Sequence, residues 1–335
     1  MPMHIQDITT SIKNIPLKTP FVTALRRVES VAFIRVEVLY SNGAVSYGEA
    51  PATKAITGET LESIRSEIDE ITPKLLGVKI DEALALLHQE DMGSSAKAAL
   101  DIALCEHICS LKIDDKSPIK TDVTISLGST KKMLADAQKA YDEGMDILKV
   151  KLGQDISHAI EVTEILSQRV PHAKLLIDAN QAWSYEDASS YIEATSKIAL
   201  ELIEQPVVAE DLESLAKLSR ISDIPIMADE AVFTLQDLKR VVELEAADMI
   251  NIKLMKCGGV SKAIEMLEYA REHNIECMLG SMLEGPYSIN STIYLAFAYR
   301  DVVMYVDLDS PLLYKELPQE LDFNYNGATV TFKDQ

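Results

Sequence analysis

The sequence predicts an α/β protein in which an eight-stranded barrel of alternating strands and helices follows a smaller α+β unit. The main observation is a change of pattern near residue 121. After it, short apolar runs alternate with amphipathic helical stretches, as in a parallel sheet. Before it, strand-like runs lead into three helical stretches. A chain of 335 residues is also long enough for a barrel with an additional domain.

The N-terminal unit begins with strand-like runs joined by Ser41-Asn42-Gly43, and an Asn-Gly pair is a strong β-hairpin signal. These runs cover residues 31–40 and 44–49, and helical spacing of apolar residues covers 60–76, 81–89 and 95–111. We therefore assign residues 1–115 to an α+β domain and residues 116–314 to the barrel. Residues 315–335 are irregular and poor in strand signals, and we expect them to pack back on the first domain.

Eight short apolar runs predict the strands of the barrel. Helical stretches fit between successive runs, for example over residues 130–143 and 156–168, so a closed barrel is favoured over an open sheet. The runs are residues 122–126, 147–152, 174–178, 200–204, 224–228, 249–254, 276–279 and 303–308.

Charge and composition argue against several classes of partner. The formal net charge is −21, whereas nucleic acid and anionic lipid surfaces bind through Lys and Arg, so we expect neither as a partner. There is no run of 18 apolar residues and no basic segment before an apolar one, which predicts a cytoplasmic protein. Cys105 and Cys109 share one face of an apolar helical stretch, which favours a buried helix over a metal site.

Acidic residues end three successive strands of the predicted barrel, at the edge where barrel active sites lie. Asp178, Glu204 and Asp229 are spaced by about one strand-helix unit. A single carboxylate after a strand often only caps the next helix. Three of them at one level would repel one another unless a divalent cation lay among them, and all-oxygen ligands favour Mg²⁺. The sequence therefore predicts a Mg²⁺ site.

Lysines lie on two strands that face each other across the predicted barrel. Strand alternation sends Lys149 and Lys151 to one face, and two lysines under the covering helices would be costly. We therefore expect both to point into the barrel mouth, with a solvated edge strand as the alternative. Lys253 lies on the sixth strand, opposite the second, and Lys256 is interpreted as a loop lysine.

Two opposed lysines beside a metal predict the transfer of an α-proton. A carbon acid next to a carboxylate is too weak for a side-chain base unless a metal stabilises the enediolate as it forms. With Lys151 on one side and Lys253 on the other, one base removes the proton and the other returns it, which inverts the stereocentre. The pKa of an isolated lysine is about 10.4, and it should fall near Mg²⁺ and the charged Lys149.

These residues, in this order, resemble the enolase superfamily and, within it, the muconate-lactonizing subgroup. The matching motifs are Lys-x-Lys, Asp-Ala-Asn, Glu-Gln-Pro, Ala-Asp-Glu and Asn-Ile-Lys, and the match covers nearly the whole chain. Members of this superfamily are known to use a lysine base with Mg²⁺, so the predicted site agrees with a known type of active site. The resemblance implies a (β/α)₇β TIM-like barrel with an N-terminal capping domain. It also implies Mg²⁺ binding by the three carboxylates, an acid/base pair of Lys151 and Lys253, and a Lys149 that assists the enolate.

Asp307 and Asp309 discriminate among the activities of the subgroup. Two carboxylates on one strand face call for a cation, and an Asp-x-Asp at the eighth strand resembles the feature by which dipeptide epimerases hold the α-ammonium of the substrate. We therefore expect both residues to bind substrate.

Segments outside the barrel strands resemble the substrate loops of L-Ala-D/L-Glu epimerases. Residues 20–26 are similar to the loop that holds a side-chain carboxylate, which makes Arg26 the candidate clamp. Residues 55–58 resemble the companion loop, so Thr57 is a second candidate contact, and both loops could act as a lid. Met282, after the seventh strand, is the third candidate, in a segment whose last residues depart from those epimerases.

The leading prediction is a Mg²⁺-dependent isomerase, a dipeptide epimerase that inverts the α-carbon of the second residue. The first substrate pair is L-Ala-D/L-Glu, with murein peptide recycling as the implied role, and we expect a homo-oligomer. The alternatives are an N-acylamino acid racemase or a cycloisomerase of the same subgroup, and a Schiff-base aldolase that uses Lys253. A non-catalytic barrel that only binds small anions is the remaining alternative.

Overall fold

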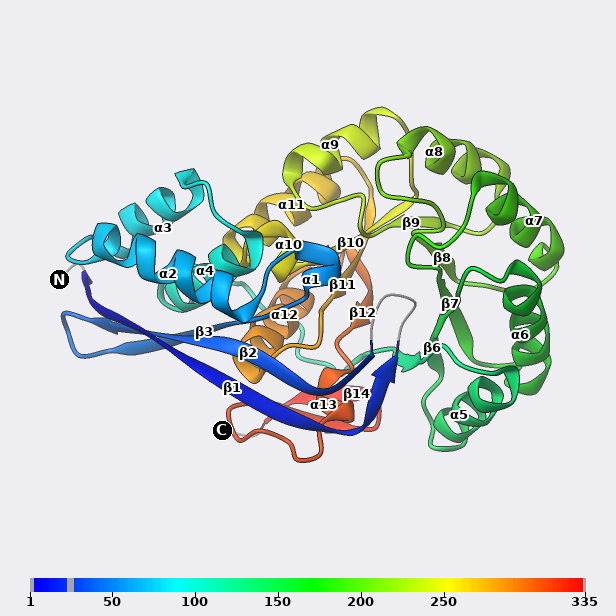
Figure 1. The fold of residues 1–335 in the computed structure, drawn as a ribbon, viewed down its shortest axis with the longest axis horizontal. Helices are drawn as coiled ribbons and strands as arrows, with labels where there is room; N and C mark the ends of the chain where they lie inside the picture. Colours follow the sequence, from blue (N-terminus) through cyan, green and yellow to red (C-terminus); the bar gives the residue numbers. More distant parts are fainter. Residues whose placement is uncertain (1–2, 23–26, 334–335) are drawn as a thin grey trace.

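The computed structural model describes residues 3–22 and 27–333, and it has the two predicted parts (Figure 1). The N-terminal capping domain starts with an antiparallel sheet of β1 (Ile5–Val22), β2 (Arg27–Tyr40) and β3 (Val45–Pro51). The predicted hairpin is confirmed, because β2 and β3 pair on either side of a turn in which Gly43 has a φ of 85°. Four helices follow: α1 (Lys54–Thr57), α2 (Leu61–Leu75), α3 (Ile80–Gln89) and α4 (Ser94–Ile108).

Helix α4 lies between the capping sheet and the barrel, and ten of its fifteen residues are buried. It packs against β3 on one side and against barrel helices on the other. Gly48 of β3 allows this approach, because a Cβ at that position would stand 1.8 Å from the carbonyl oxygen of Ala99. Cys105 and Cys109 form a disulfide at the C-terminal end of the helix, which the sequence did not predict. Helix α4 therefore packs against both the capping sheet and the barrel and joins the two domains.

The barrel is an eight-stranded parallel sheet with helices outside it, as predicted (Figure 1). Its strands are β5 (Val123–Ile125), β6 (Ile147–Lys151), β7 (Lys174–Asp178), β8 (Leu202–Glu204), β9 (Ile226–Ala228), β10 (Met249–Lys253), β11 (Glu276–Gly280) and β12 (Val303–Asp307). Its helices are α5 (Thr130–Asp142), α6 (Ile156–Arg169), α7 (Tyr185–Thr195), α8 (Leu212–Ile221), α9 (Leu235–Glu243), α10 (Leu254–Cys257), α11 (Val260–Glu272), α12 (Pro286–Ala298) and α13 (Ser310–Leu313).

The first and last barrel strands are joined by contacts made by single residues. The Asp122 N–H donates to the carbonyl oxygen of Val306 at 2.9 Å. The Thr121 hydroxyl accepts from the backbone N–H of Leu308 at 2.8 Å. These contacts bring β12 beside β5 and close the sheet into a barrel.

Apolar side chains fill the barrel interior near the N-terminal ends of the strands. Leu176 and Leu202 stand two residues before Asp178 and Glu204, so strand alternation puts them on the same inward face. They pack with Met227, Met249 and Met278 in one buried cluster. This cluster closes the barrel beneath the charged residues, which leaves those residues at the opposite end.

One strand was missed, and one expectation about strands was wrong. Strand β1 was not predicted, because its alternation is irregular and it contains Pro16 and Pro20. Residues 315–335 were expected to lack strands, but β13 (Phe323–Asn326) and β14 (Thr329–Phe332) form a hairpin that pairs with β4 (Ile119–Lys120). The division of the chain at residue 115 stays a prediction. None of the helices in the described ranges is long and apolar enough to cross a membrane.

Candidate active site

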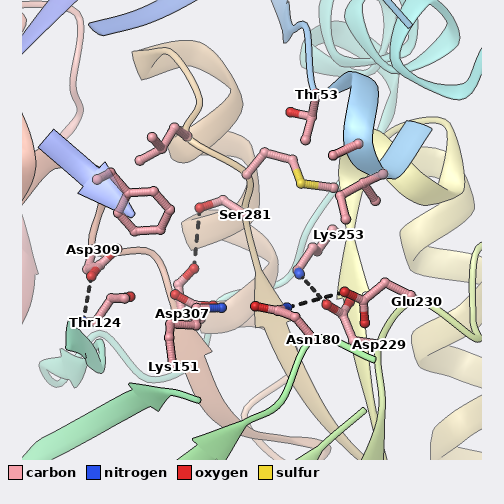
Figure 2. Close-up of a pocket in the computed structure, with 15 residues that line it drawn as sticks. Thr53, Thr124, Lys151, Asn180, Asp229, Glu230, Lys253, Ser281, Asp307 and Asp309 are labelled. Atoms are coloured by element: carbon pink, nitrogen blue, oxygen red, sulfur yellow. Dashed lines mark hydrogen bonds and ion pairs between the residues drawn. The ribbon is translucent and has the colours of Figure 1, made fainter. Parts of the chain in front are cut away.

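Charged residues predicted for the site lie at the carboxyl ends of the barrel strands, and Figure 2 shows five of them: Lys151, Asp229, Lys253, Asp307 and Asp309. Strand register places Lys151 beside Asp178, and Asp178 beside Glu204. Farther around the barrel, Lys253 is beside Gly280, and Gly280 beside Asp307. A Cβ on Gly280 would stand 3.0 Å from Cε of Lys253, so a glycine at this position leaves room for the lysine side chain.

Lys151 and Lys253 both line the pocket at the barrel mouth, each with a residue exposure of 7%. They come from β6 and β10, which are four strands apart in the order of the eight-stranded sheet and therefore face each other. Lys151 Nζ lies 2.5 Å from Asp178 Oδ2, and Lys253 Nζ lies 2.6 Å from Asp229 Oδ2. Each predicted base thus contacts one predicted metal ligand.

Neighbouring carboxylates decide the pKa of Lys253. Burial is the largest single effect and lowers this pKa, but the nearby carboxylates, Asp229 first and then Glu204 and Glu230, raise it, and the net shift is upward from the ordinary value. The same contact works in reverse on the acid. Burial would raise the pKa of Asp229, and Lys253 and Lys256 hold it below its usual range. The expected fall in the pKa of Lys253 therefore requires another positive group to neutralise the charge of Asp229.

Lys149 is fully buried, in contrast to its two partners at the pocket. Its Nζ lies 2.6 Å from Asp307 Oδ2, 2.7 Å from Glu204 Oε2 and 3.3 Å from Asp178 Oδ2. Burial lowers its pKa, but these acids more than reverse the effect and raise it well above the usual value. Lys149 therefore holds a permanent positive charge beneath the mouth and ties the acids of β7, β8 and β12 together.

Lys256 was interpreted as a loop lysine, and that interpretation is wrong. It is 2% exposed, because the short helix α10 turns its side chain back toward β10. Its Nζ donates to the backbone oxygen of Asn251 at 2.9 Å and to Asp229 Oδ1 at 2.6 Å. Gln205 holds the same segment from the other side, since its Oε1 accepts the backbone N–H groups of Asp229 and Ala231. Asp229 is thus fixed by two residues that were not predicted.

Negative charge exceeds positive charge in the described part of this site. Seven buried carboxylates face four buried lysines, a formal excess of three negative charges. Burial, followed by the charge of Asp178, raises the pKa of Glu204 to about 7. Burial and Asp229 raise the pKa of Glu230 to about 8. The acids are Asp122, Asp178, Glu204, Asp229, Glu230, Asp307 and Asp309, and the lysines are Lys149, Lys151, Lys253 and Lys256.

The side chains present fit a hard divalent cation. Asp178, Glu204 and Asp229 offer an all-oxygen donor set, which is the set that Mg²⁺ prefers. Glu204 Oε2 and Glu230 Oε2 are buried without a hydrogen-bond partner among the described residues, although the former is within ion-pair distance of Lys149. Within those residues, no three acidic, His or Cys side chains form a ready-made metal cage. Lysine ammonium groups contact oxygens of all three acids instead.

Asp307 and Asp309 line the same pocket, on the side of β12 and β5. Asp307 is paired with Lys149, whereas Asp309 Oδ2 accepts the backbone N–H of Thr124 at 2.8 Å. Burial and the neighbouring Asp307 raise the pKa of Asp309 to about 6, which marks a position where a cation would be stabilised. Asp309 lies after the end of β12 and is the residue that precedes α13.

The mouth of the pocket is formed partly by the capping domain (Figure 2). Phe21, Thr53, Ala55 and Ile56 contribute from there, and Met282 contributes from the barrel. Thr57 is not among the described residues that line the pocket, and its hydroxyl faces Ser95 Oγ at 3.3 Å. Arg26 lies outside the described residues, so its place at the mouth stays a prediction.

Asn180 is a pocket residue that the sequence reasoning missed. It donates from Nδ2 to Glu230 Oε1 at 3.2 Å and has a φ of 44°. Residues other than glycine seldom adopt a positive φ, and Asn is among the residue types that tolerate it best. The Asp-Ala-Asn and Ala-Asp-Glu motifs contain both residues, so the motifs were the available signal.

Comparisons with known proteins find a matching family and relatives that align with nearly the whole chain. Residues 132–335 match the model of a family described as enolase C-terminal domain-like. The chain is 54% identical to an L-amino acid-D/L-Glu epimerase of Sulfurimonas denitrificans, over 98% of this chain and 99% of the relative. It is 37% identical to an L-Ala-D/L-Glu epimerase of Bacillus subtilis, over 98% of this chain and 94% of the relative.

Solved structures of related proteins have the same fold. A substrate-liganded complex of the L-Ala-D/L-Glu epimerase from Bacillus subtilis superposes with a TM-score of 0.91, at 37% identity, over 98% of this chain and 96% of that one. A dipeptide epimerase from Enterococcus faecalis complexed with Mg and the dipeptide L-Leu-L-Tyr gives a TM-score of 0.91, at 30% identity, over 100% of this chain and 98% of that one.

Proposed function

Because this chain belongs to the enolase C-terminal domain-like family, we propose that it is a Mg²⁺-dependent dipeptide epimerase that inverts the second residue. The observation that carries the proposal is the pair Lys151 and Lys253, which face each other across a pocket bordered by Asp307 and Asp309. The names of the relatives make dipeptides that end in D- or L-Glu the first substrates to test. A cytoplasmic location, a homo-oligomer and a part in murein peptide recycling stay predictions.

In this proposal the two lysines exchange the roles of base and acid. One removes the α-proton of the second residue, and the lysine on the opposite side delivers a proton to the other face, so that the centre inverts. Asp178, Glu204 and Asp229 would hold Mg²⁺. The bound ion would supply positive charge to the substrate carboxylate. It would also neutralise the acids that contact the lysines, which lowers the pKa of the lysines. Lys149 adds a fixed positive charge beneath the same acids.

Isotope exchange tests the proposal most directly. L,L-dipeptides incubated with the enzyme and Mg²⁺ in D₂O should gain one deuterium at the α-carbon of the second residue, detected as a mass increase. We expect L-Ala-L-Glu to be among the fastest substrates, and the opposite epimer should appear alongside the label. If no dipeptide of the library incorporated deuterium, the proposed function would be wrong.

Replacing Asp309 tests how the substrate is recognised. Asp309→Asn keeps an acceptor for the Thr124 N–H but removes the negative charge that would face the α-ammonium. A charge-assisted hydrogen bond contributes about 1.5–3 kcal/mol, so kcat/KM for L-Ala-L-Glu should fall about 10- to 150-fold. N-acetyl-L-Ala-L-Glu lacks the ammonium group and is the matched control. Equal losses with both compounds would contradict the assigned role.

A further inference from the structure

Helix α4 of the capping domain contacts α10 and α11 of the barrel (Figure 1), and α10 directly follows one of the two lysines, Lys253. Asp101, in the middle of α4, is completely buried. Its Oδ1 accepts the backbone N–H of Ser261 at 3.0 Å, and its Oδ2 accepts the Ser261 hydroxyl at 2.5 Å. His88 Nε2, from α3, lies 2.7 Å from the same Oδ2 and 3.1 Å from the Ser261 hydroxyl. These three residues form a contact between the domains, here called the clasp.

The clasp is too tightly packed to be an incidental surface contact. A Cβ on Gly259 would stand 2.3 Å from Asp101 Oδ1, so only glycine leaves room for this carboxylate. Gly258 and Gly259 have φ values of 92° and 120°, a backbone conformation that also favours glycine. The chain therefore turns sharply beneath Asp101 and enters α11 with Ser261 held by it.

The segment held by the clasp leads directly to Lys253. Helix α10 lies between the two, and its Leu254 carbonyl accepts the backbone N–H groups of both Gly258 and Gly259 at 3.0 Å. Lys253 is the residue that precedes α10, and Lys256 within α10 contacts Asp229. Moving α10 would therefore shift Lys253 and a predicted metal ligand together.

The other lysine is supported in a different way. Lys151 ends β6, which pairs with β5 and β7, both of them strands of the barrel. The backbone after it is held by β7 as well, since the Leu152 N–H donates to the Asp178 carbonyl at 2.9 Å. Lys253 likewise ends a barrel strand, since β10 pairs with β11 up to Lys253 and Gly280. The two lysines thus differ in what holds the backbone that follows them: a barrel strand for Lys151, and a helix in contact with the capping domain for Lys253.

We infer that Asp101 is a positioning residue for Lys253, so that the capping domain controls one of the two proton transfers. This inference rests on the proposed function and deepens it. Loss of the clasp would let α10 shift and would slow proton transfer on the Lys253 side more than on the Lys151 side. A displacement of about 1 Å at a reacting group can cost about a hundredfold in rate.

Exchange measured separately for the two epimers of Ala-Glu in D₂O tests the inference. Each single-lysine variant, Lys253→Ala and Lys151→Ala, first shows which epimer depends on which lysine. Asp101→Asn should then slow exchange of the Lys253-dependent epimer about tenfold or more and change that of the other epimer less than about twofold. Epimerisation should slow by one common factor in both directions, because the equilibrium constant is unchanged.

Glu67→Gln is the matched control. Glu67 Oε2 accepts the backbone N–H of Gly93, the residue before α4, at 2.7 Å, so this variant also removes a carboxylate that holds α4, but through a contact within the capping domain. It should leave the ratio of the two exchange rates unchanged. If Asp101→Asn does not fold, Ser261→Ala removes the hydroxyl from the barrel side and should shift the ratio in the same direction.

The outcomes separate this inference from the proposed function. A wild-type enzyme that exchanges neither epimer would refute the proposed function. A wild-type enzyme that exchanges both, combined with clasp variants that slow both epimers equally or neither, would overturn the positioning role of Asp101 and leave the epimerase intact.

Discussion

Replacing either pocket lysine by alanine is expected to stop epimerisation and to leave half of the exchange reaction intact. Lys151 and Lys253 lie on opposite sides of the pocket, so each can reach the α-proton of only one epimer. Losing a general acid or base costs up to about 10⁴-fold in rate, and epimerisation needs both lysines. Lys151→Ala should therefore still exchange the α-proton of one epimer, and Lys253→Ala that of the other. Chiral chromatography with mass detection measures both quantities.

A lysine outside the site provides the control for this result. Lys217, on α8, is half exposed and pairs with Glu213, so Lys217→Ala should keep full activity. Two outcomes would contradict the two-base assignment. One is unchanged epimerisation in both pocket variants, and the other is loss of exchange for the same epimer in both. Borohydride added with substrate should trap nothing on Lys253, whereas a Schiff-base aldolase would be labelled there.

Glu204→Gln is expected to lower activity strongly by weakening Mg²⁺ binding. The substitution keeps the shape of a side chain that is completely buried, so the packing of β8 should be preserved. It removes one of three negative charges that we assign to the metal. Because a metal ion contributes several kcal/mol of charge stabilisation, kcat/KM should fall about a thousandfold. Calorimetry with Mg²⁺ alone should show weakened binding, which measures the effect independently of turnover.

Glu201→Gln is the matched control for the metal prediction. Glu201 stands three residues before Glu204, at the other end of the strand, where it is partly exposed and pairs with Lys174. That variant should bind Mg²⁺ as the wild type does. EDTA should inactivate the wild-type enzyme, and added Mg²⁺ should restore it. Mg²⁺ binding that is the same in Glu204→Gln and the wild type would remove Glu204 from the metal site.

The barrel and its charged rim could be predicted because period and spacing encode them directly. Asp178 and Glu204 end short apolar runs one strand-helix unit apart, and parallel strands bring such ends to one edge. Strand β1 could not be predicted, because prolines and an irregular alternation hide a strand that is stabilised mainly by pairing with β2. The pairing of β14 with β4 joins distant parts of the chain, which local pattern does not specify.

The residues around the charged rim were harder to predict than the rim itself. Lys256 appears in sequence as one more polar residue after a strand, and only the turn of α10 buries it against Asp229. Asp101 lies in an apolar helical stretch, where sequence gives no sign that its partner is Ser261, 160 residues away. Such contacts depend on how two domains pack, and helical or strand periodicity carries no information about that.

The way the barrel closes has a consequence for how the protein folds. The Thr124–Asp309 hydrogen bond joins residues 185 positions apart, and the contacts of Thr121 and Asp122 with β12 span similar distances. Contacts between such distant residues form slowly, and until they form, β5 and β12 are open edges that can pair with other chains. The strand that seals the barrel also carries Asp307, and Asp309 follows it. Recovery of activity during refolding should therefore be as slow as the last step of barrel assembly. At high protein concentration, part of the protein should aggregate before that step.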